Sequence, residues 1–426
     1  MRDERLSVLW LCGPPGAGKS AVGWALYDGL ARSGARAGFV DLDQLGMCLP
    51  APPDDPERLR LKERNVSAVT ANFRQAGCGA LVVSGDLGLS SAISAGTVPG
   101  ASLTVCRLRA SPAELRRRLQ ARGAPDLAAG SLQEAEELDR SLLADACVDT
   151  DGLTVSEVAR LVRERCGRWP PERPASAGTD ETAPTARPAA GAGGEVLLVC
   201  GAAGVGKSAV GFEVYLRQLR AGLAAAYLDL GQIGFMGAAP AGDLGGHRLR
   251  ARNLADLWRA YHEAGARRLV LSGPVPDARV AAVYAGALPA ADVTVCRLDA
   301  GPAELARRIS RRGQGLSWPE PGDPLIGRPE ARLRLAAERA AADAEALEHS
   351  GLGDLRIDTD GLPPGKYAAS AAWLAQGVIA FHLARAAATA ATAPLAGYCP
   401  LPATLSAATK RSVRTGSGTR SSQISR

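Results

Sequence analysis

Short apolar runs alternate with longer amphipathic stretches along most of the chain. In the first part of the sequence the apolar runs lie near residues 6–12, 37–41, 80–84, 103–108 and 146–149. Between and after them, apolar residues recur at helical spacing over 19–33, 57–76, 112–122, 131–144 and 155–166. Short apolar runs are typical of buried strands, and the longer periodic stretches are typical of helices. Their alternation predicts an α/β fold of three layers, in which helices cover both faces of a parallel sheet.

The same pattern occurs a second time further along the chain. Lys19 matches Lys207, and we call the distance of 188 residues between these two positions the repeat offset. Five further segments match in the same order, the first three at this offset, the fourth at a shift of 190 and the last at a shift of 209: 41–46 with 229–234, 60–65 with 248–253, 81–85 with 269–273, 105–108 with 295–298, and 149–153 with 358–362. Constant order and nearly constant spacing indicate an internal duplication. The sequence therefore predicts two copies of one domain, over residues 1–168 and 195–385, and two such copies in one chain can pair with each other.

Two segments have no apolar period. Residues 169–194 are rich in Pro, Ala, Gly, Thr and Ser, which is typical of a flexible linker. Residues 386–426 are rich in Ala and Thr and then basic, and we expect a disordered tail there.

The charge does not indicate a nucleic-acid-binding protein. The formal net charge is +6, and five of these charges belong to the basic tail, which has no acidic residue. The charged N-terminus leads directly into the first apolar run, unlike a signal peptide. The most lipid-like stretch, 367–384, contains Gln376 and His382 and predicts a terminal helix rather than a membrane span. We expect a cytoplasmic protein that binds neither nucleic acid nor a membrane.

The cysteines and histidines do not predict a metal site. The chain has nine cysteines, and no two of them are spaced as Cys-x-x-Cys. Several lie in apolar strand-like runs, which favours reduced, buried thiols over disulfides or zinc. The four histidines show no metal-ligand spacing.

Two glycine-rich segments, 13–20 and 201–208, fit the phosphate-binding pattern G-x-x-x-x-G-K-[ST]. Each follows an apolar run and opens a helical stretch, so that backbone N–H groups can converge on phosphate oxygens at the positive end of the helix dipole. The residues expected to hold a nucleotide are Gly13, Gly16, Gly18, Lys19 and Ser20, with Gly201, Gly204, Gly206, Lys207 and Ser208 in the second loop. The hydroxyl groups of Ser20 and Ser208 are expected to hold Mg²⁺.

Other motifs narrow the class of P-loop protein. The chain has no Leu-Ser-Gly-Gly-Gln transporter signature and no Asn-Lys-x-Asp guanine-binding motif. The run at 80–84 is followed by Gly85 and Asp86, not by the Asp-Glu pair of many ATPases. Instead, an acidic motif follows the second strand, a Cys-Arg-Leu strand end leads into Pro-Ala-Glu-Leu and paired arginines, and Asp-Thr-Asp-Gly-Leu ends the last strand.

On these motifs each copy resembles the small-molecule and nucleotide kinase branch of P-loop proteins. This branch includes adenylylsulfate, shikimate and gluconate kinases, chloramphenicol phosphotransferase and zeta-type toxin kinases, and the chain looks most like kinase-like ATP-binding proteins of actinobacteria. The resemblance covers residues 5–166 and 195–383. It implies ATP and Mg²⁺ as cofactors, a parallel five-stranded sheet of order 2-3-1-4-5 in each copy, and a mobile lid after the fourth strand.

Asp41 and Asp43 follow the second strand, and alternation in an extended segment puts them on the same side. In kinases of this type an acid here orients or deprotonates the acceptor, or holds Mg²⁺ through water. We expect Asp43 to be the base and Asp41 its support or the Mg²⁺ partner; a solvated pair of strand-end acids is the alternative. The second copy keeps Asp229 but has Gly231 in place of Asp43, so its chemistry is impaired if that base is essential.

Arg118 and Arg122 lie four residues apart on one predicted helix, as do Arg308 and Arg312. The resemblance implies that these arginines flank the lid and approach the nucleotide, for which the permanent charge and forked shape of arginine are suited. A solvated helix face is the alternative.

Two further pairs of segments recur in both copies. The Arg64-Asn65 and Arg252-Asn253 pairs either bind an anionic acceptor or serve the start of a helix. The Asp149-Thr150 and Asp358-Thr359 pairs either line the adenine side or form a plain strand-end turn.

The lids differ in length. The segment from Arg122 to Asp149 is shorter than its counterpart from Arg312 to Asp358, so the second copy has the longer lid. The leading hypothesis is a kinase that transfers the γ-phosphate of ATP to a small-molecule acceptor, and we favour the first copy as the catalyst. The alternative is a non-catalytic, regulatory nucleotide-binding protein with degenerate kinase folds. A third, weaker hypothesis is a toxin-like kinase that acts on a nucleotide sugar.

Overall fold

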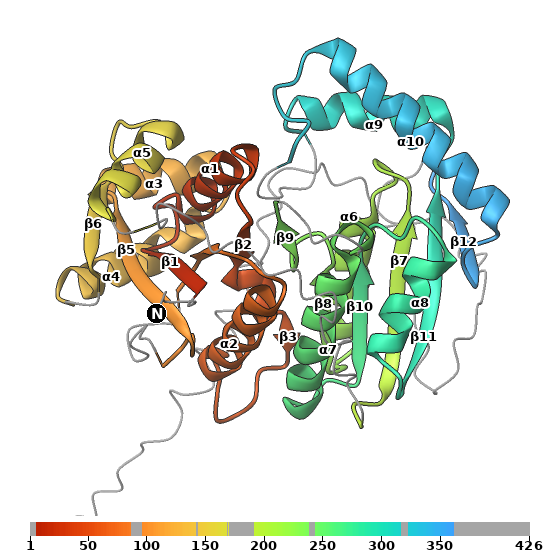
Figure 1. The fold of residues 1–426 in the computed structure, drawn as a ribbon, viewed down its shortest axis with the longest axis horizontal. Coiled ribbons are helices and arrows are strands. Elements are labelled where there is room, and N and C mark those ends of the chain that lie inside the picture. The colour runs from red at the N-terminus through yellow and green to blue at the C-terminus, as the bar shows by residue number, and fades with distance from the viewer. Residues whose placement is uncertain are drawn as a thin grey trace, which may run out of the picture.

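The computed structural model describes residues 6–86, 96–141, 144–167, 169, 191–237, 243–316 and 323–361. We call residues 6–169 the first half and residues 191–361 the second half. Each half is built around one sheet (Figure 1). The predicted basic tail, the stretch 367–384 and most of the predicted linker lie outside the described residues.

The strands and helices of the first half lie where the apolar pattern predicts them. They are β1 (Leu6–Cys12), α1 (Lys19–Arg32), β2 (Ala37–Asp41), the 3-10 helix η1 (Leu42–Gly46), β3 (Cys48–Leu49), α2 (Leu59–Gln75), β4 (Ala80–Ser84), β5 (Ala101–Arg109), α3 (Pro112–Ala121), η2 (Pro125–Leu127), α4 (Ala128–Asp139), β6 (Ala146–Asp149) and α5 (Val155–Arg165). The short strand β3 has no counterpart in the prediction.

The second half repeats most of this order, with the helix α8 in addition and no described counterpart of α5. Its elements are β7 (Gly194–Gly201), α6 (Lys207–Arg220), β8 (Ala225–Asp229), β9 (Phe235–Met236), η3 (Leu244–Gly246), α7 (His247–Glu263), β10 (Arg268–Ser272), α8 (Ala278–Ala287), β11 (Ala291–Asp299), α9 (Pro302–Gly313), α10 (Glu330–Ser350) and β12 (Leu355–Asp358). The longer lid is formed partly by α10, which has 21 residues where α4 has 12.

Each sheet has six strands instead of the five expected. The strand orders are β6-β5-β1-β4-β2-β9 and β12-β11-β7-β10-β8-β3. In each sheet the five strands from its own half run parallel, and the sixth is antiparallel and comes from the other half. The expected five-stranded, all-parallel sheet is therefore wrong in this respect, because each edge is extended by the other half of the chain.

The two exchanged strands are equivalent to each other. Met236 of β9 pairs with Gly38 of β2, and Cys48 of β3 pairs with Ala226 of β8. The repeat offset maps Cys48 onto Met236 and Gly38 onto Ala226, so the exchange is reciprocal. Figure 1 shows β9 beside β2, where the two halves meet.

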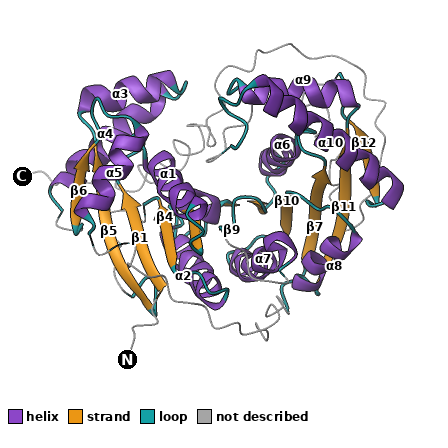
Figure 2. Ribbon diagram, turned by 45° about the horizontal axis from the view of Figure 1, so that its top comes forward, coloured by secondary structure: helices purple, strands orange, loops and turns teal. Residues whose placement is uncertain are grey.

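Alternating residues of the strands face two different cores. Leu9 and Leu11 of β1 pack in a cluster with residues of α1 and α5. Val8 and Trp10 point to the other face, in a cluster that continues through α2 into α7 and the second sheet. Helices α2 and α7 lie side by side between the sheets (Figure 2). One continuous core therefore joins the halves.

Polar contacts also cross this junction. The Asn72 amide nitrogen of α2 donates to Asn253 Oδ1 at 3.0 Å and to Asp256 Oδ2 at 2.9 Å, both on α7. Arg64 of α2 forms an ion pair with Glu263.

Both ends of the predicted linker pack against the halves. Trp169 is only 2% exposed, and its indole nitrogen donates to the Ser7 carbonyl at 3.2 Å. Gly194, expected as the last linker residue, is the first residue of β7.

Within the described ranges, no helix is long and apolar enough to cross a membrane. The eight cysteines that the structure describes are all free thiols.

Candidate nucleotide-binding site

The glycines of both P-loops adopt backbone angles that other residues avoid. The φ values of Gly13, Gly16 and Gly18 are 140°, 91° and 99°. At Gly13 a Cβ atom would also collide with the Leu108 carbonyl oxygen. The second loop repeats these angles, with φ of 135° at Gly201, 86° at Gly204 and 96° at Gly206. Glycine lets each loop close tightly at the N-terminus of a 14-residue helix, where a phosphate is favoured.

Lys19 lies folded back over its own loop. Its amino group donates to the Gly13 carbonyl and forms a 2.9 Å ion pair with Asp86, which follows β4. Asp86 also accepts a hydrogen bond from the Gly13 N–H at 3.1 Å. Burial opposes the charge of Lys19, but Asp86, Glu134 and Asp43 together outweigh it and raise the pKa of the lysine. The Asp86 carboxylate therefore engages two of the groups expected to bind a phosphate.

Asp86 is not among the site residues that the sequence predicts. The second half has Pro274 at the equivalent position, so the repeat gives no signal there. In that half, the Lys207 amino group donates to the Ala202 carbonyl at 2.8 Å.

Ser20 and Asp41 lie in direct contact beside the first loop. The Ser20 hydroxyl donates to Asp41 Oδ2 at 2.6 Å, and the Ser84 hydroxyl at the end of β4 donates to the same oxygen at 3.2 Å. The Asp43 N–H donates to the other carboxylate oxygen at 3.0 Å. Burial, together with the neighbouring Asp43, raises the pKa of Asp41 to about 6.

The second half has the same three hydrogen bonds around its own aspartate. Asp229 accepts from the Ser208 hydroxyl at 2.7 Å, the Ser272 hydroxyl at 2.8 Å and the Gly231 N–H at 2.8 Å. Ser84 and Ser272 are not among the predicted site residues, although their recurrence at the repeat offset is a signal in the sequence.

A serine hydroxyl and a carboxylate in contact are the hard oxygen donors that Mg²⁺ prefers. The described residues contain no group of three or more His, Cys, Asp or Glu side chains that could hold a metal ion by themselves. A pair of protein ligands fits Mg²⁺ in particular, because this ion keeps several waters and binds phosphate oxygens in nucleotide sites.

Asp43 lies in a different environment from Asp41. Its side chain is 63% exposed and forms a 3.2 Å ion pair with Lys62 of α2. Partial burial would raise the pKa of Asp43, but Lys62 and Lys19 outweigh this effect and hold it below its usual range. Asp43 is thus an ionised carboxylate at the surface of the site, whereas Asp41 is buried at 6% exposure.

Arg118 forms hydrogen bonds with the backbone of the first P-loop and stabilises the loop. Its guanidinium donates to the carbonyls of Gly16 and Ala17 at 3.2 and 3.3 Å, and to the hydroxyl and carbonyl of Thr150 at 3.0 and 2.8 Å. Glu114 accepts from its Nε at 2.7 Å. These contacts tie the guanidinium nitrogens of Arg118 to the chain itself, and its approach to a nucleotide stays a prediction.

Arg308 makes the equivalent contacts in the second half. It donates to the Val205 carbonyl at 3.1 Å and to Thr359 Oγ1 at 2.9 Å. The other two predicted arginines differ from each other: Arg122 is exposed at the end of α3, and Arg312 pairs with Asp323 of the second lid at 2.5 Å.

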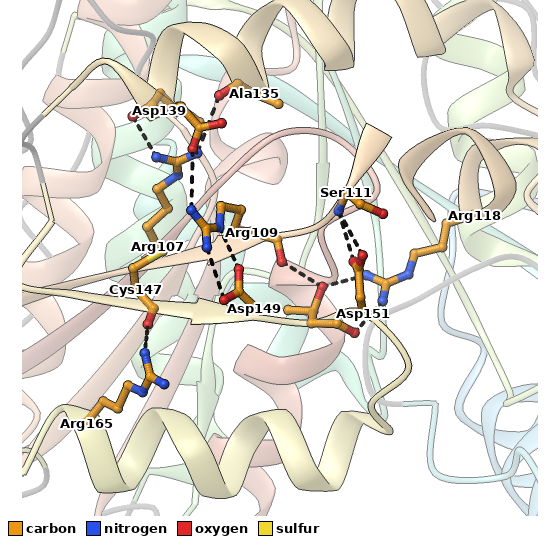
Figure 3. A network of polar contacts seen from close by, with 12 residues as sticks. Arg107, Arg109, Ser111, Arg118, Ala135, Asp139, Cys147, Asp149, Asp151 and Arg165 are labelled. Atoms are coloured by element: carbon orange, nitrogen blue, oxygen red, sulfur yellow. Dashed lines mark hydrogen bonds and ion pairs between the residues drawn. The ribbon is translucent and has the colours of Figure 1, made fainter. Parts of the chain in front are cut away.

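Figure 3 shows the polar network around the turn after β6. Asp149 pairs with Arg109 at 2.5 Å, and Asp151 accepts from the Ser111 N–H at 2.9 Å. Thr150 between them is held by Arg118. The contacts favour the strand-end turn over an adenine-binding segment, and the turn joins β5, β6 and α3 to the P-loop.

In the Arg64-Asn65 and Arg252-Asn253 pairs, both asparagines and Arg64 have structural contacts. Arg252 is buried, and its Nε and one terminal nitrogen have no hydrogen-bond partner among the described residues. The Asn65 amide donates to the Leu45 carbonyl at 2.6 Å, and the Asn253 amide donates to the Ile233 carbonyl at 2.5 Å. Each asparagine thereby holds the turn that follows Asp41 or Asp229. Both pairs lie in the second turn of a helix, α2 or α7, and not at its start, so the helix-start expectation is wrong in this respect.

One more acidic side chain faces the first site from the lid. The Ser131 hydroxyl of α4 donates to the Pro15 carbonyl at 2.7 Å, which holds this helix on the P-loop. Glu134 follows one turn later on the same side of the helix. Burial and then Asp86 raise the pKa of Glu134 to about 7. The sequence offers no signal for this residue outside the three-dimensional arrangement.

Comparisons with solved structures return kinases among their matches. The chain is similar to the adenylylsulfate (APS) kinase CysC of Mycobacterium tuberculosis, solved in complex with AMPPNP and APS, with 19% identity, a TM-score of 0.28 and coverage of 38% of this chain and 98% of the other. A gluconokinase of Sinorhizobium meliloti matches with 22% identity, a TM-score of 0.26 and coverage of 39% and 94%. The shikimate kinase of Acinetobacter baumannii, in complex with shikimate, matches with 18% identity, a TM-score of 0.27 and coverage of 39% and 97%.

No protein-family model matches the chain, and no curated protein matches it. A candidate function therefore has to stand on the residues of the site.

Proposed function

We propose that the chain is a tandem pair of P-loop kinase-like domains, expected over residues 1–168 and 195–385, and that it binds ATP with Mg²⁺. The observation that carries this proposal is the serine–carboxylate pair beside each P-loop, Ser20 with Asp41 and Ser208 with Asp229. A loop lysine, a hydroxyl and a buried carboxylate in contact are the groups that a magnesium–nucleotide complex requires.

In this proposal each group has one task. The loop N–H groups and Lys19 hold the β- and γ-phosphates, and Asp41 and Ser20 hold the metal. Mg²⁺, when bound there, neutralises charge on the phosphate oxygens. The second loop, Ser208 and Asp229 do the same in the second half.

We propose that the first half transfers the γ-phosphate to a small-molecule acceptor. The acceptor hydroxyl oxygen forms a bond to the γ-phosphorus, the bond to the β-phosphate oxygen breaks, and the hydroxyl proton passes to Asp43. The ionised state of Asp43 supports this role, although Lys62 must release it when the acceptor binds. The second half has Gly231 at this position and holds nucleotide without this base.

Gly231 also supports the competing function, a regulatory protein in which neither half turns nucleotide over. The two functions are separated by measuring ATP binding and turnover in the wild type and in Lys19→Ala, Lys207→Ala and Asp43→Ala. We expect each lysine variant to lose one ATP site, and only Lys19→Ala and Asp43→Ala to lose turnover. Two ATP sites with no turnover across a pool of candidate acceptors would leave the regulatory function standing.

A further inference from the structure

An aromatic ring lies at the same place beside each P-loop helix. The two rings are Phe39 of β2 and Tyr227 of β8, which match at the repeat offset, and both are buried. A Cβ atom built on Gly23 of α1 would lie 2.9 Å from Cε2 of Phe39. A Cβ atom built on its equivalent, Gly211 of α6, would lie 3.2 Å from the same ring atom of Tyr227. The rings are therefore placed alike, and the difference between the halves is the Tyr227 hydroxyl.

This hydroxyl reaches the groups that surround the second acidic turn. It lies 2.7 Å from Ser272 Oγ and 3.3 Å from the Ser208 carbonyl oxygen. Ser272 Oγ in turn lies 2.8 Å from Asp229 Oδ2, the oxygen that also accepts from the Ser208 hydroxyl. Tyr227, Ser272 and Asp229 thus form one continuous buried network of side chains.

The direction of each hydrogen bond in this network follows from the protons available. A carboxylate that holds a metal is ionised and can only accept, so Ser272 must use its single hydroxyl proton for Asp229. Tyr227 must then donate its own proton to Ser272 Oγ. A hydroxyl that accepts one hydrogen bond is polarised and donates the next one more strongly. The Tyr227 hydroxyl therefore strengthens the hydrogen bond that holds Asp229.

The first half holds its aspartate less tightly. Ser84 Oγ lies 3.2 Å from Asp41 Oδ2 and 3.4 Å from Ser20 Oγ, and the Phe39 ring has no proton to donate to it. Hydrogen bonds between oxygens usually lie at about 2.5–3.0 Å, so the Ser84 bond is longer than usual and weaker than its counterpart.

Tyr227 is itself fixed by both halves. Its N–H donates to the Met47 carbonyl at 2.9 Å, just before the exchanged strand β3. Its ring packs edge-on against Phe212 of α6, with ring centroids 5.5 Å apart. A side chain held in this way can orient the groups that it contacts.

We propose that Tyr227 is a positioning residue of the second site, which acts through Ser272 to hold the Asp229 carboxylate in place for Mg²⁺. Groups that hydrogen-bond to a metal ligand orient it, and their loss typically weakens metal binding by about tenfold or more. That Asp229 holds Mg²⁺ rests on the proposed function, whereas the hydrogen-bond network does not. The half that has Gly231 in place of the base is thus the half whose metal carboxylate is held more firmly, as suits a site that retains nucleotide.

The test compares ADP affinity in Mg²⁺ with ADP affinity in EDTA, and we call the ratio of the two the magnesium effect. A Lys19→Ala background isolates the second site. Tyr227→Phe, which gives the second half the ring of the first, is expected to lower the magnesium effect by about tenfold and to leave ADP affinity in EDTA unchanged. Tyr215→Phe is the matched control, because it removes a hydroxyl from a ring whose centroid lies 6.0 Å from that of Tyr227.

Two further variants test the path of the effect. In a Ser272→Ala background, Tyr227→Phe is expected to cause no additional loss, because the hydroxyl acts through Ser272. Phe39→Tyr in a Lys207→Ala background is expected to raise the magnesium effect at the first site.

An unchanged magnesium effect in Tyr227→Phe overturns the proposal. An equal loss of ADP affinity in Mg²⁺ and in EDTA also overturns it, because the hydroxyl would then support the loop and not the metal ligand. If the wild type binds no ADP, the proposed function fails, and Mn²⁺ alone is titrated into the Asp41→Asn variant and followed by electron paramagnetic resonance. A Mn²⁺ site weakened by Tyr227→Phe and not by Tyr215→Phe leaves the positioning role standing without the kinase, and any other result overturns that role as well.

Discussion

Phe235, in the second half, lies with its ring centroid 4.8 Å from that of Trp24, in the first half. Its ring also approaches Tyr27 and Phe39, at 6.2 and 6.1 Å. Met47 is its equivalent and packs in a cluster with the equivalent aromatic side chains of the second half, Phe212, Tyr215 and Tyr227. Each half therefore inserts one apolar side chain, Phe235 within β9 or Met47 just before β3, among three aromatic rings of the other half.

Phe235→Ala is expected to destabilise the whole chain. Removing the ring leaves a cavity between the halves, and a large-to-small change of this kind lowers the free energy of unfolding by about 3 kcal/mol. Urea unfolding followed by tryptophan fluorescence measures the loss, because Trp24 lies against the deleted ring. Leu316→Ala, at a side chain that is 59% exposed, is the control and is expected to change little. A loss no larger than that of the control would mean that this contact does not hold the halves together.

Magnesium-dependent nucleotide binding at the first site is expected to weaken below pH 6. The pKa of Asp41 is raised to about 6, so the folded, unliganded protein holds a proton there that the metal must displace. Affinity falls by about tenfold per pH unit below that value. The same shift means that Asp41 contributes stability below its unfolded pKa that is lost as the pH rises through 6. Binding titrations from pH 5 to 8 in a Lys207→Ala background isolate the first site. An Asp41→Asn variant that keeps the full pH dependence would assign it to another group.

Asp86→Asn is expected to tighten nucleotide binding at the first site by roughly threefold to tenfold. The Asp86 carboxylate competes with a phosphate for the Lys19 amino group and the Gly13 N–H, and the amide removes the competing charge. Calorimetry in the Lys207→Ala background measures the change. Weaker binding in Asp86→Asn would show instead that this carboxylate helps to hold the metal–nucleotide complex.

Arg118→Lys is expected to weaken nucleotide binding at the first site by about tenfold, because an ammonium cannot reach both the loop carbonyls and Thr150. Arg122→Lys is the matched control, four residues further along the same helix and exposed. Equal effects of the two changes would contradict the bracing role and favour the original expectation that both arginines meet the nucleotide.

The longer strands and helices could be predicted from the sequence because their apolar patterns extend over enough residues to recognise. The two P-loops could be predicted because each has the complete motif and the motif occurs twice. The exchanged strands β3 and β9 could not. Each has two residues, too few for any period, and each finds its partner in the other half of the chain. The spacing of Arg118 and Arg122 predicts a shared helix face, but not that one guanidinium turns inward to the P-loop. Asp86 has Pro274 as its counterpart and lies in no motif, so its contacts with Lys19 and Gly13 become visible only in the structure.

The reciprocal strand exchange has a consequence for how the two sites can change. Each half closes an edge of the other's sheet, so that separation would leave β2 and β8 as open edges prone to pairing with other chains. Two identical subunits joined in this way would share every substitution, and both sites would gain or lose a residue together. Here the two halves are different segments of one chain, so a substitution in one half does not change the other. The first site can therefore have Asp43 and Asp86 where the second has Gly231 and Pro274, while the strand exchange between the halves is kept.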